Sequence, residues 1–209
     1  MADGSKFWDR IADRYAARAI RDAGAYDAAI ARTRAHLKPC DHVLELGCGT
    51  GTTALRLADA AARIDATDFS TRMIEIATGK ARAAGVASVA FSRADLTDPA
   101  AAPGPYDAVL AFNLLQLMPD LPAALALIAA RVKPGGVFVS KSVCLGEPGW
   151  RRARIVVGAL RAVGIAPPLR FLRITALDAA IERAGFEIVE RGMFPERPPG
   201  RFLVARRVA

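Results

Sequence analysis

The sequence has few of the side chains that most often bind metals or carry acid–base chemistry. Its 209 residues include only three cysteines and two histidines. Cys40, Cys48 and Cys144 are far apart and lack metal-ligand spacing, so we expect no metal site and a reducing, cytoplasmic setting. His36 and His42 both lie near the start of the first predicted strand, remote from the sheet edge where ligands gather. This placement argues against a histidine-dependent catalytic base.

Long apolar runs are also absent. No stretch approaches the roughly 20 consecutive apolar residues that a membrane-spanning helix requires, and the N-terminus lacks the apolar run of a secretory signal. Hydrophobic residues make up 53% of the chain and charged residues 24%, which is typical of a globular protein with a substantial core. The net charge of +8 would attract nucleic acid, anionic lipid or an acidic substrate, and does not select among them.

A glycine-rich turn joins a short apolar strand to a helical pattern. Residues 43–51 read Val-Leu-Glu-Leu-Gly-Cys-Gly-Thr-Gly. Glycines allow the backbone to approach a ligand closely, and the helix start beyond them offers free N–H groups. Asp68 follows the next apolar strand, where a carboxylate is well placed for ribose hydroxyls. We interpret this segment as a nucleoside-binding site.

The glycine spacing distinguishes between nucleosides. A dinucleotide fingerprint has Gly or Ala at position 52, where this chain has Thr52. A phosphate-binding P-loop needs Gly-Lys-Ser/Thr, and no lysine occurs between Lys38 and Lys80. The pattern Glu-x-Gly-x-Gly-x-Gly instead resembles the first motif of the class I S-adenosylmethionine-dependent methyltransferases. The resemblance implies a small-molecule methyltransferase that uses S-adenosylmethionine, releases S-adenosylhomocysteine and needs no metal.

The order of further motifs extends this resemblance over nearly the whole chain. Residues 7–15 are similar to the family's Phe-Trp-Asp-x-Ile-Ala-x-x-Tyr opening, and residues 68–73 to Asp-x-Ser-x-x-Met. Residues 106–115 match Tyr-Asp-x-Val followed by Leu, and residues 133–136 read Lys-Pro-Gly-Gly. The implied fold is α/β: a Rossmann-like three-layer sandwich with a seven-stranded, mostly parallel sheet, an antiparallel last strand and an N-terminal helical lid.

The resemblance also implies which residues hold the cofactor. These are Tyr15, Glu45, Gly47, Cys48, Gly49, Gly51, Asp68, Phe69, Asp95, Leu96 and Asn113. Asp68 would bind the ribose, while Asp95 and Leu96 would hold the adenine. Asp95 can equally be interpreted as part of a turn or as a helix cap. Asp65 competes with Asp68, but it lies within its strand rather than at the carboxyl end where ligands bind.

The acceptor is expected to be a small molecule. Candidate substrate-pocket residues are Trp8, Tyr15, Gln116 and Trp150. The aromatic pair Trp8 and Tyr15 would either cover the methionine end of the cofactor or simply pack its helix onto the sheet. Residues 113–115 read Asn-Leu-Leu rather than Asn/Asp-Pro-Pro-aromatic, and no Pro-Cys nucleophile is suitably placed, which argues against nucleic-acid bases.

The predicted reaction is an in-line methyl transfer to an O-, C- or N-nucleophile of an aromatic, quinone-like or lipid acceptor, driven mainly by proximity. No catalytic residue is assigned. Two alternatives stay open at this stage. A nicotinamide-dependent oxidoreductase is disfavoured by Thr52. A non-catalytic nucleoside-binding or lipid-surface protein is suggested by the basic helix over residues 150–163.

We expect a single methyltransferase domain over residues 1–209. Its predicted parts are a helical lid (1–38), a cofactor-binding core (39–145), a basic cap helix (146–174) and a closing helix and hairpin (175–209). The basic helix can be a substrate cap, a contact with an anionic membrane or a plain surface helix. The patterns further predict helices over 52–61, 121–132 and 175–184, the last capped by Thr175, and strands over 137–143, 186–191 and 201–208.

Overall fold

The computed structural model of the protein describes residues 2–98, 102–162 and 164–208. The strands are β1 (His42–Leu46), β2 (Arg63–Asp68), β3 (Val89–Arg93), β4 (Tyr106–Phe112), β5 (Val132–Val143), β6 (Phe186–Met193) and β7 (Gly200–Arg207). The helices are α1 (Ala2–Ala16), α2 (Ala23–Arg34), α3 (Thr52–Arg56), α4 (Thr71–Ala83), α5 (Leu121–Arg131), α6 (Arg151–Ala162) and α7 (Ile174–Arg183), with short 3-10 turns η1 (Leu115–Leu117) and η2 (Pro148–Trp150).

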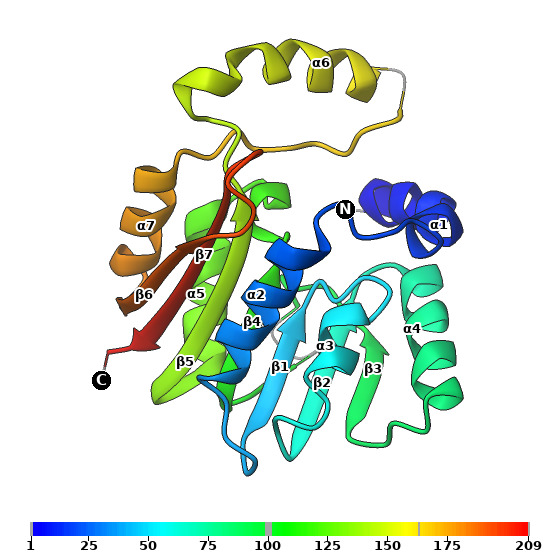
Figure 1. Cartoon of the computed structure of the whole chain (residues 1–209), viewed down its shortest axis with the longest axis vertical. Coiled ribbons are helices and arrows are strands. Elements are labelled where there is room, and N and C mark those ends of the chain that lie inside the picture. Colours follow the sequence, from blue (N-terminus) through cyan, green and yellow to red (C-terminus); the bar gives the residue numbers. More distant parts are fainter. Residues whose placement is uncertain (1, 99–101, 163, 209) are drawn as a thin grey trace.

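The strands form one sheet in the order β3-β2-β1-β4-β5-β7-β6, with helices on both faces (Figure 1). β7 is antiparallel to β5 and β6, while the other paired strands are parallel. Parallel strands end at the same edge of a sheet, so the carboxyl ends of β1 to β5 gather at one edge. The predicted three-layer α/β sandwich is confirmed.

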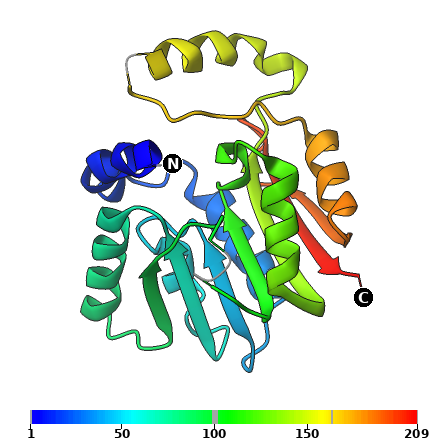
Figure 2. The same cartoon turned by 180° about the vertical axis from the view of Figure 1, so that it is seen from behind.

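The core has two halves because neighbouring residues of a strand point to opposite faces of the sheet. In β4, Val109 belongs to the cluster under α5 and α7, whereas Leu110 belongs to the cluster under α2 and α3. Both are fully buried. Burial on both faces explains why this central strand is an unbroken apolar run in the sequence. Figure 2 shows the face covered by α5 and α7.

The two N-terminal helices have different positions. α2 packs on the sheet through Ala29 and Ile30, both buried in the core. α1 instead lies beyond the carboxyl edge of the sheet and packs against α4 (Figures 1 and 2). Of the segment expected to form a lid, residues 1–38, only α1 lies beyond this edge, and α2 is a layer helix.

Helix α3 ends at Arg56, so it is shorter than the helix predicted over 52–61. The chain then turns tightly, with the Ala60 N–H donating to Leu57 O over 2.9 Å. Next, the Ala62 N–H donates to Asp41 O over 3.0 Å and starts the return into β2. The apolar pattern beyond Arg56 therefore reflects a buried turn, in which Leu57 is fully covered.

The cap predicted at Thr175 is wrong. α7 begins at Ile174 after Arg173, whose side chain makes no cap bond. The Ile174 N–H instead donates to Oε1 of Glu147 over 2.8 Å. A carboxylate from a distant segment thereby satisfies one of the unpaired N–H groups that every helix start leaves.

The Lys-Pro-Gly-Gly segment shifts the register of β5 rather than preceding it. Helix α5 ends at Arg131, and Val132 already pairs with Tyr106. The next pair is Ala108 with Val137, so residues 133–136 bulge out of the ladder. β5 thus begins five residues before the predicted start at Val137.

Candidate functional site

The glycines of the first motif are required by close packing at the carboxyl end of β1. Gly47 and Gly51 have φ of +65° and +76°, which residues with a Cβ resist. A Cβ on Gly47 would lie 2.8 Å from Cδ1 of Leu114, and one on Gly51 would lie 2.6 Å from Cζ of Phe91. Both distances are shorter than non-bonded carbon atoms tolerate. These two positions therefore hold the turn tightly against its neighbours.

Gly49, between them, faces open space. Its φ is +53°, and the nearest atom to a Cβ there would be Cε1 of Tyr15, at 3.9 Å. Its N–H donates to Oδ2 of Asp68 over 2.9 Å. The tip of the turn thus lies between a carboxylate at the end of β2 and an aromatic ring of α1, and its exposed backbone is free to contact a ligand.

Asp68 is held in place by two backbone donors. Besides Gly49, the Ser70 N–H donates to its Oδ1 over 2.9 Å. The side chain is only 7% exposed, and this burial raises the pKa of the carboxyl, although the two N–H groups oppose the shift. Asp65 is engaged elsewhere, since its Oδ2 lies 2.7 Å from Nε2 of His42 at the start of β1. Of the two carboxylates, Asp68 is the one beside the glycine turn.

Glu45 lies beneath the turn and has an oxygen without a partner. It is 1% exposed, and Oε2 makes no hydrogen bond within the described part of the chain. Burial raises the pKa of this carboxyl to about 8. Cys48 is likewise buried, and its N–H donates to Thr67 O over 2.9 Å. An unpaired buried carboxyl oxygen fits a ligand that carries an amino group.

The aromatic residues of α1 cover this region. Trp8 contacts Tyr15 edge to face, with ring centroids 6.3 Å apart, and Tyr15 is the residue closest to the outer side of Gly49. The pKa of the Tyr15 hydroxyl is raised by burial of this group and by the charges of Asp68 and Glu45. Tyr15 nevertheless keeps 47% of its surface exposed, so it covers the turn without being part of the core.

Two acidic residues that the sequence did not single out hold α1 in this position. Oδ1 of Asp9 accepts from the Ser70 hydroxyl over 2.6 Å and from the Arg72 N–H over 3.0 Å. Asp13 pairs with the Arg72 guanidinium at 2.7 Å. Phe69 packs beneath the same helix, next to Gly4. Asp9 and Asp13 are one helical turn apart, and this spacing was the only signal in the sequence.

The predicted adenine residues lie after β3. Oδ1 of Asp95 accepts from the Thr97 N–H over 2.9 Å and from its hydroxyl over 2.8 Å, which agrees with the interpretation of Asp95 as a turn residue. The segment is also tied to the end of β2, because the Ala94 N–H donates to Asp68 O over 2.9 Å. Leu96 is 9% exposed and packs into the core.

A buried arginine that the sequence did not single out holds this loop. Arg131, 3% exposed, donates from Nη2 to Leu96 O over 3.2 Å and to Asp98 O over 2.9 Å. Its Nε donates to Ala102 O over 2.9 Å. At the last turn of α5, an arginine would ordinarily be interpreted as a partner of the helix dipole. Its actual role is to fix the segment that presents Leu96.

The residues on the predicted acceptor side of the site are spread over several elements. Asn113 has a φ of +56°, and its N–H donates to Lys141 O over 2.6 Å. Gln116 is 6% exposed, and its Oε1 has no partner among the described residues. Trp150 lies in η2, where its N–H donates to Glu147 O. The contacts of the described residues do not bring Trp150 together with Gln116 or Trp8.

The histidines are at the opposite end of the sheet. Nε2 of His36 lies 2.8 Å from Glu190, and Nε2 of His42 lies 2.7 Å from Asp65. Within residues 2–98, 102–162 and 164–208, no group of three or more His, Cys, Asp or Glu side chains is arranged to hold a metal ion. The described titratable groups at the carboxyl edge include carboxyls, tyrosines and lysines.

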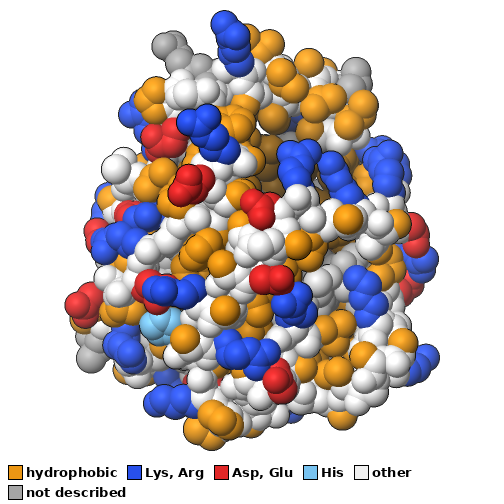
Figure 3. Space-filling view, in the orientation of Figure 1, with side chains coloured by type: hydrophobic (Ala, Val, Ile, Leu, Met, Phe, Trp, Pro, Cys, Tyr) orange, Lys and Arg blue, Asp and Glu red, His pale blue; other side chains and the backbone are white. Residues whose placement is uncertain are grey.

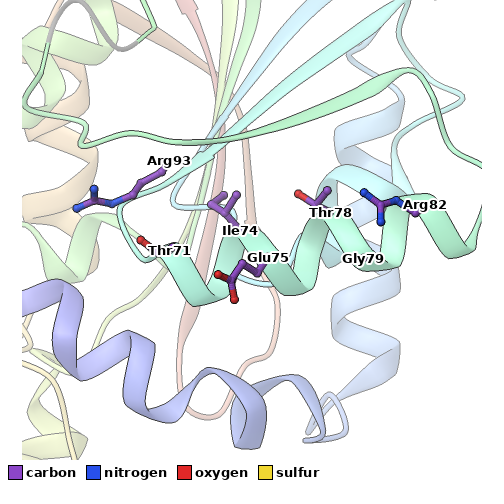
Figure 4. Close-up of a pocket in the computed structure, with 7 residues that line it drawn as sticks. All are labelled: Thr71, Ile74, Glu75, Thr78, Gly79, Arg82 and Arg93. Carbon is purple, nitrogen blue, oxygen red and sulfur yellow. The ribbon is translucent and has the colours of Figure 1, made fainter.

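One pocket of about 350 Å³ lies between α4 and β3 (Figure 4). It is lined by Thr71, Ile74, Glu75, Thr78, Gly79, Arg82 and Arg93. None of these is a predicted site residue. The candidate site is thus defined by the glycine turn and its carboxylates rather than by this pocket.

Comparisons with known proteins agree with this geometry. A family model described as a methyltransferase domain matches residues 43–136, which span the glycine turn and β1 to β4. A ubiquinone biosynthesis O-methyltransferase of Burkholderia pseudomallei is 28% identical over 192 residues, covering 88% of this chain and 79% of the relative. The chain belongs to the class I S-adenosylmethionine-dependent methyltransferases.

Two further similarities support this assignment. A ubiquinone biosynthesis O-methyltransferase of Thiobacillus denitrificans is 31% identical over 155 residues, covering 71% of this chain and 65% of the relative. The crystal structure of magnesium protoporphyrin IX methyltransferase from Synechocystis PCC 6803 with bound S-adenosylhomocysteine superposes with a TM-score of 0.71. It is 21% identical and covers 99% of this chain and 95% of that structure, so it confirms the fold. The methyltransferase acts on a small-molecule acceptor, and the two alternative functions are set aside.

Proposed function

We propose that this methyltransferase methylates a hydroxyl oxygen of a small apolar aromatic acceptor, which it takes from an anionic membrane surface. The observation that carries the proposal is helix α6, which lies beyond the carboxyl edge of the sheet (Figure 1). This helix exposes apolar side chains together with arginines. The curated relatives named above support oxygen as the acceptor atom, because both are named O-methyltransferases in ubiquinone biosynthesis.

The proposed cofactor residues are those implied by the family resemblance, and the geometry of the glycine turn supports several of them. When bound, S-adenosylmethionine supplies an electrophilic methyl group on a positively charged sulfur. Asp68 would accept hydrogen bonds from the ribose hydroxyls, and Asp95 with Leu96 would hold the adenine. The unpaired Oε2 of Glu45 would receive the amino group of the methionine end. α1 covers the turn through Tyr15, which excludes water from the reacting groups.

Helix α6 has the composition of a membrane-surface helix. Ile155, Val156 and Leu160 are 75%, 57% and 37% exposed. Arg152 and Arg161 on the same helix are exposed as well. Figure 3 shows hydrophobic and basic side chains together on this part of the surface, above a recess with hydrophobic walls. Apolar side chains enter the acyl boundary while arginines pair with anionic headgroups, so such a helix favours an anionic bilayer over a neutral one.

No helix in the part of the chain that the structure describes is long and apolar enough to span a bilayer. Residue 163, the last of the predicted basic helix, lies outside the described residues. Membrane contact through α6 would therefore be peripheral. It would place the apolar recess next to the lipid phase from which a lipophilic acceptor has to be taken.

The acceptor class is tested by methyl transfer from radiolabelled S-adenosylmethionine to a panel of an alkyl catechol, an alkyl amine and a fatty acid. We expect the catechol to be methylated at least tenfold faster than the others. Transfer to the amine or the fatty acid alone would overturn the choice of a hydroxyl oxygen. S-adenosylhomocysteine titrated in a calorimeter checks that the donor site is intact in the same preparation.

Membrane contact is tested by co-sedimentation with vesicles of phosphatidylglycerol or phosphatidylcholine. We expect binding to the anionic vesicles only, lost in the double variant I155E/V156E. The matched control is V189E, since Val189 is a 46% exposed apolar residue of β6, away from α6. Equal binding of the double variant and the control would contradict the assignment of α6 as the contact surface.

A further inference from the structure

Lys141 occupies an unusual position for a charged side chain. It lies near the carboxyl end of β5 and is only 8% exposed. Its neighbours in the sheet are Phe112 of β4 and Phe202 of β7. The Asn113 N–H donates to its carbonyl, which fixes the end of β4 to this residue. A lysine is thus placed in an aromatic part of the sheet next to the predicted acceptor side.

The ammonium group of Lys141 has no acceptor for its protons. It lies 5.7 Å from the ring centroid of Tyr26, and none of the described residues forms a hydrogen bond or ion pair with it. The nearest carboxylate that acts on it, Asp22, instead accepts from the Ala25 N–H at the start of α2. A lysine that is only 8% exposed and whose nitrogen has no partner among the described residues is available to a ligand or for proton transfer.

The sheet register places Lys141 on the same face as Glu45. Glu45 pairs with Leu110, which pairs with Val139, and Lys141 is two residues beyond Val139 on the same side of β5. The strand order runs from β3 and β2, where the adenosine residues lie, through β1 to β4 and β5. Lys141 is therefore on the far side of the glycine turn from the nucleoside, where an acceptor has to lie.

Other titratable groups of the site are placed differently. Asp68 accepts two backbone N–H groups, and the Tyr26 hydroxyl shares a hydrogen bond with Thr53 over 3.0 Å. Glu45 keeps an unpaired Oε2, but it lies beneath the glycine turn, where we place the donor. Both histidines pair with carboxylates at the opposite end. Lys141 is a buried base on the acceptor side whose nitrogen has no hydrogen-bond partner among the described residues.

We propose that Lys141 is a catalytic residue that takes the proton from the acceptor hydroxyl as the methyl group is transferred. This inference rests on the proposed function. The O–H bond breaks and the proton binds the uncharged Nζ. The acceptor oxygen forms a bond to the methyl carbon as the carbon–sulfur bond breaks, so the sulfonium becomes a neutral thioether. The ammonium group then releases its proton to solvent.

Electrostatics around Lys141 are consistent with this role. Burial lowers the pKa of its amine, although the Asp22 carboxylate opposes the shift. The other polar groups that face it are the Tyr26 ring and the Arg56 guanidinium, which lies 5.9 Å from the same ring. A lowered pKa increases the fraction of uncharged amine near neutral pH, and only the uncharged amine accepts a proton.

The first test follows the ionisation of a chromophoric acceptor, 4-nitrocatechol, bound in the presence of S-adenosylhomocysteine. At a pH one unit below the pKa of the free probe, we expect the wild type to bind it as the coloured anion and K141M to bind it uncharged. The matched control K38M removes an exposed lysine before β1 and should resemble the wild type. Uncharged probe bound to the wild type, or no bound probe, would overturn the inference.

The second test separates proton transfer from simple charge. With an alkyl catechol at neutral pH, K141M and K141R should both lose about 100-fold in kcat, because neither side chain accepts a proton. With 4-nitrocatechol ionised beforehand, K141R should recover most of the rate and K141M should not. A kcat of K141M within threefold of the wild type on the alkyl catechol would refute the role of Lys141.

These outcomes are distinguishable from failure of the proposed function. Wild type that binds S-adenosylhomocysteine but methylates no phenol would contradict the proposed acceptor, and the nitrocatechol spectrum would still test Lys141. S-adenosylhomocysteine affinity should be equal in wild type and K141M, because Lys141 is placed on the acceptor side. A loss of donor affinity above tenfold in K141M would overturn the inference by assigning the lysine to the donor.

Discussion

The Gly49 N–H donates a hydrogen bond to Oδ2 of Asp68 over 2.9 Å. The bond joins the tip of the glycine turn after β1 to the carboxyl end of β2. It therefore fixes the distance between the two features from which the nucleoside site was inferred. The same carboxylate also accepts from the Ser70 N–H, at the start of α4.

The first prediction concerns this bond. We expect D68A to raise the dissociation constant of S-adenosylhomocysteine at least tenfold, about 1.4 kcal/mol, and G49R to abolish binding. Arginine at position 49 would need a φ of +53° and would project toward Tyr15. Calorimetric titration measures both. D65A is the control, since Asp65 lies within β2 and pairs with His42. Unchanged affinity in D68A and G49R would refute the site assignment.

The second prediction concerns Glu45 and pH. Burial raises its pKa to about 8, so Glu45 stabilises the fold fully below its unfolded pKa near 4.5, and this contribution is lost as pH rises through 8. The variant E45Q does not titrate. Its free energy of unfolding relative to wild type should therefore rise between pH 4.5 and 8, by no more than about 5 kcal/mol. Denaturant unfolding at several pH values measures this difference, and a flat difference would contradict the burial effect.

A third prediction links the same carboxyl to the donor. A cation placed beside Glu45 lowers its pKa, so binding of a ligand with an ammonium group should release a proton at pH 7. Calorimetry of S-adenosylhomocysteine in buffers of different ionisation enthalpy measures the number released. We expect close to one proton for wild type and none for E45Q. Equal release by the two proteins would assign the proton to another group.

The fourth prediction concerns Arg131. R131M removes the donor to the carbonyls of Leu96 and Ala102, so we expect a loss of at least about 2 kcal/mol in the free energy of unfolding. Because the loop presents Leu96, S-adenosylhomocysteine affinity should fall as well. Amide hydrogen exchange of residues 96–98 should accelerate more than that of β1. R183M is the control, because Arg183 is an exposed arginine in the last turn of α7.

The fifth prediction concerns the attachment of α1. D9A removes the acceptor of the Ser70 hydroxyl and the Arg72 N–H, which should cost about 1 kcal/mol locally. Protease cleavage between residues 17 and 22 should become several-fold faster, while the melting temperature of the core changes little. The control D59A removes an exposed carboxylate that pairs with Arg34, distant from α1. Equal cleavage of the two variants would show that Asp9 does not hold the helix.

The glycine turn and its neighbouring carboxylate could be predicted because their signals are local. Three glycines two residues apart, an apolar strand before them and Asp68 after the next strand all lie within residues 43–68. The order of the motifs likewise carried the family resemblance that implied the sandwich. Such features depend on backbone conformation and on burial along single elements, which neighbouring residues largely determine.

The ends of several elements were mispredicted because distant residues decide them. The cap of α7 comes from Glu147, 27 residues away, and not from Thr175. α3 stops early because the chain has to return to Asp41 and enter β2. The apolar pattern that predicts a helix does not identify these distant partners. Their tertiary contacts override the local helix preference at the ends of the elements.

By itself, the amino-acid sequence determined the order of strands and helices, the glycine turn and the type of donor. Only the tertiary structure showed the contacts of Asp9 and Arg131 and the burial of Lys141, since each depends on neighbours from another element. Arg131 and Lys141 would be ordinary cations at the end of a helix and a strand. They become significant because folding buries them, and a buried charged or polar group is stable only with a partner that the sequence does not place beside it.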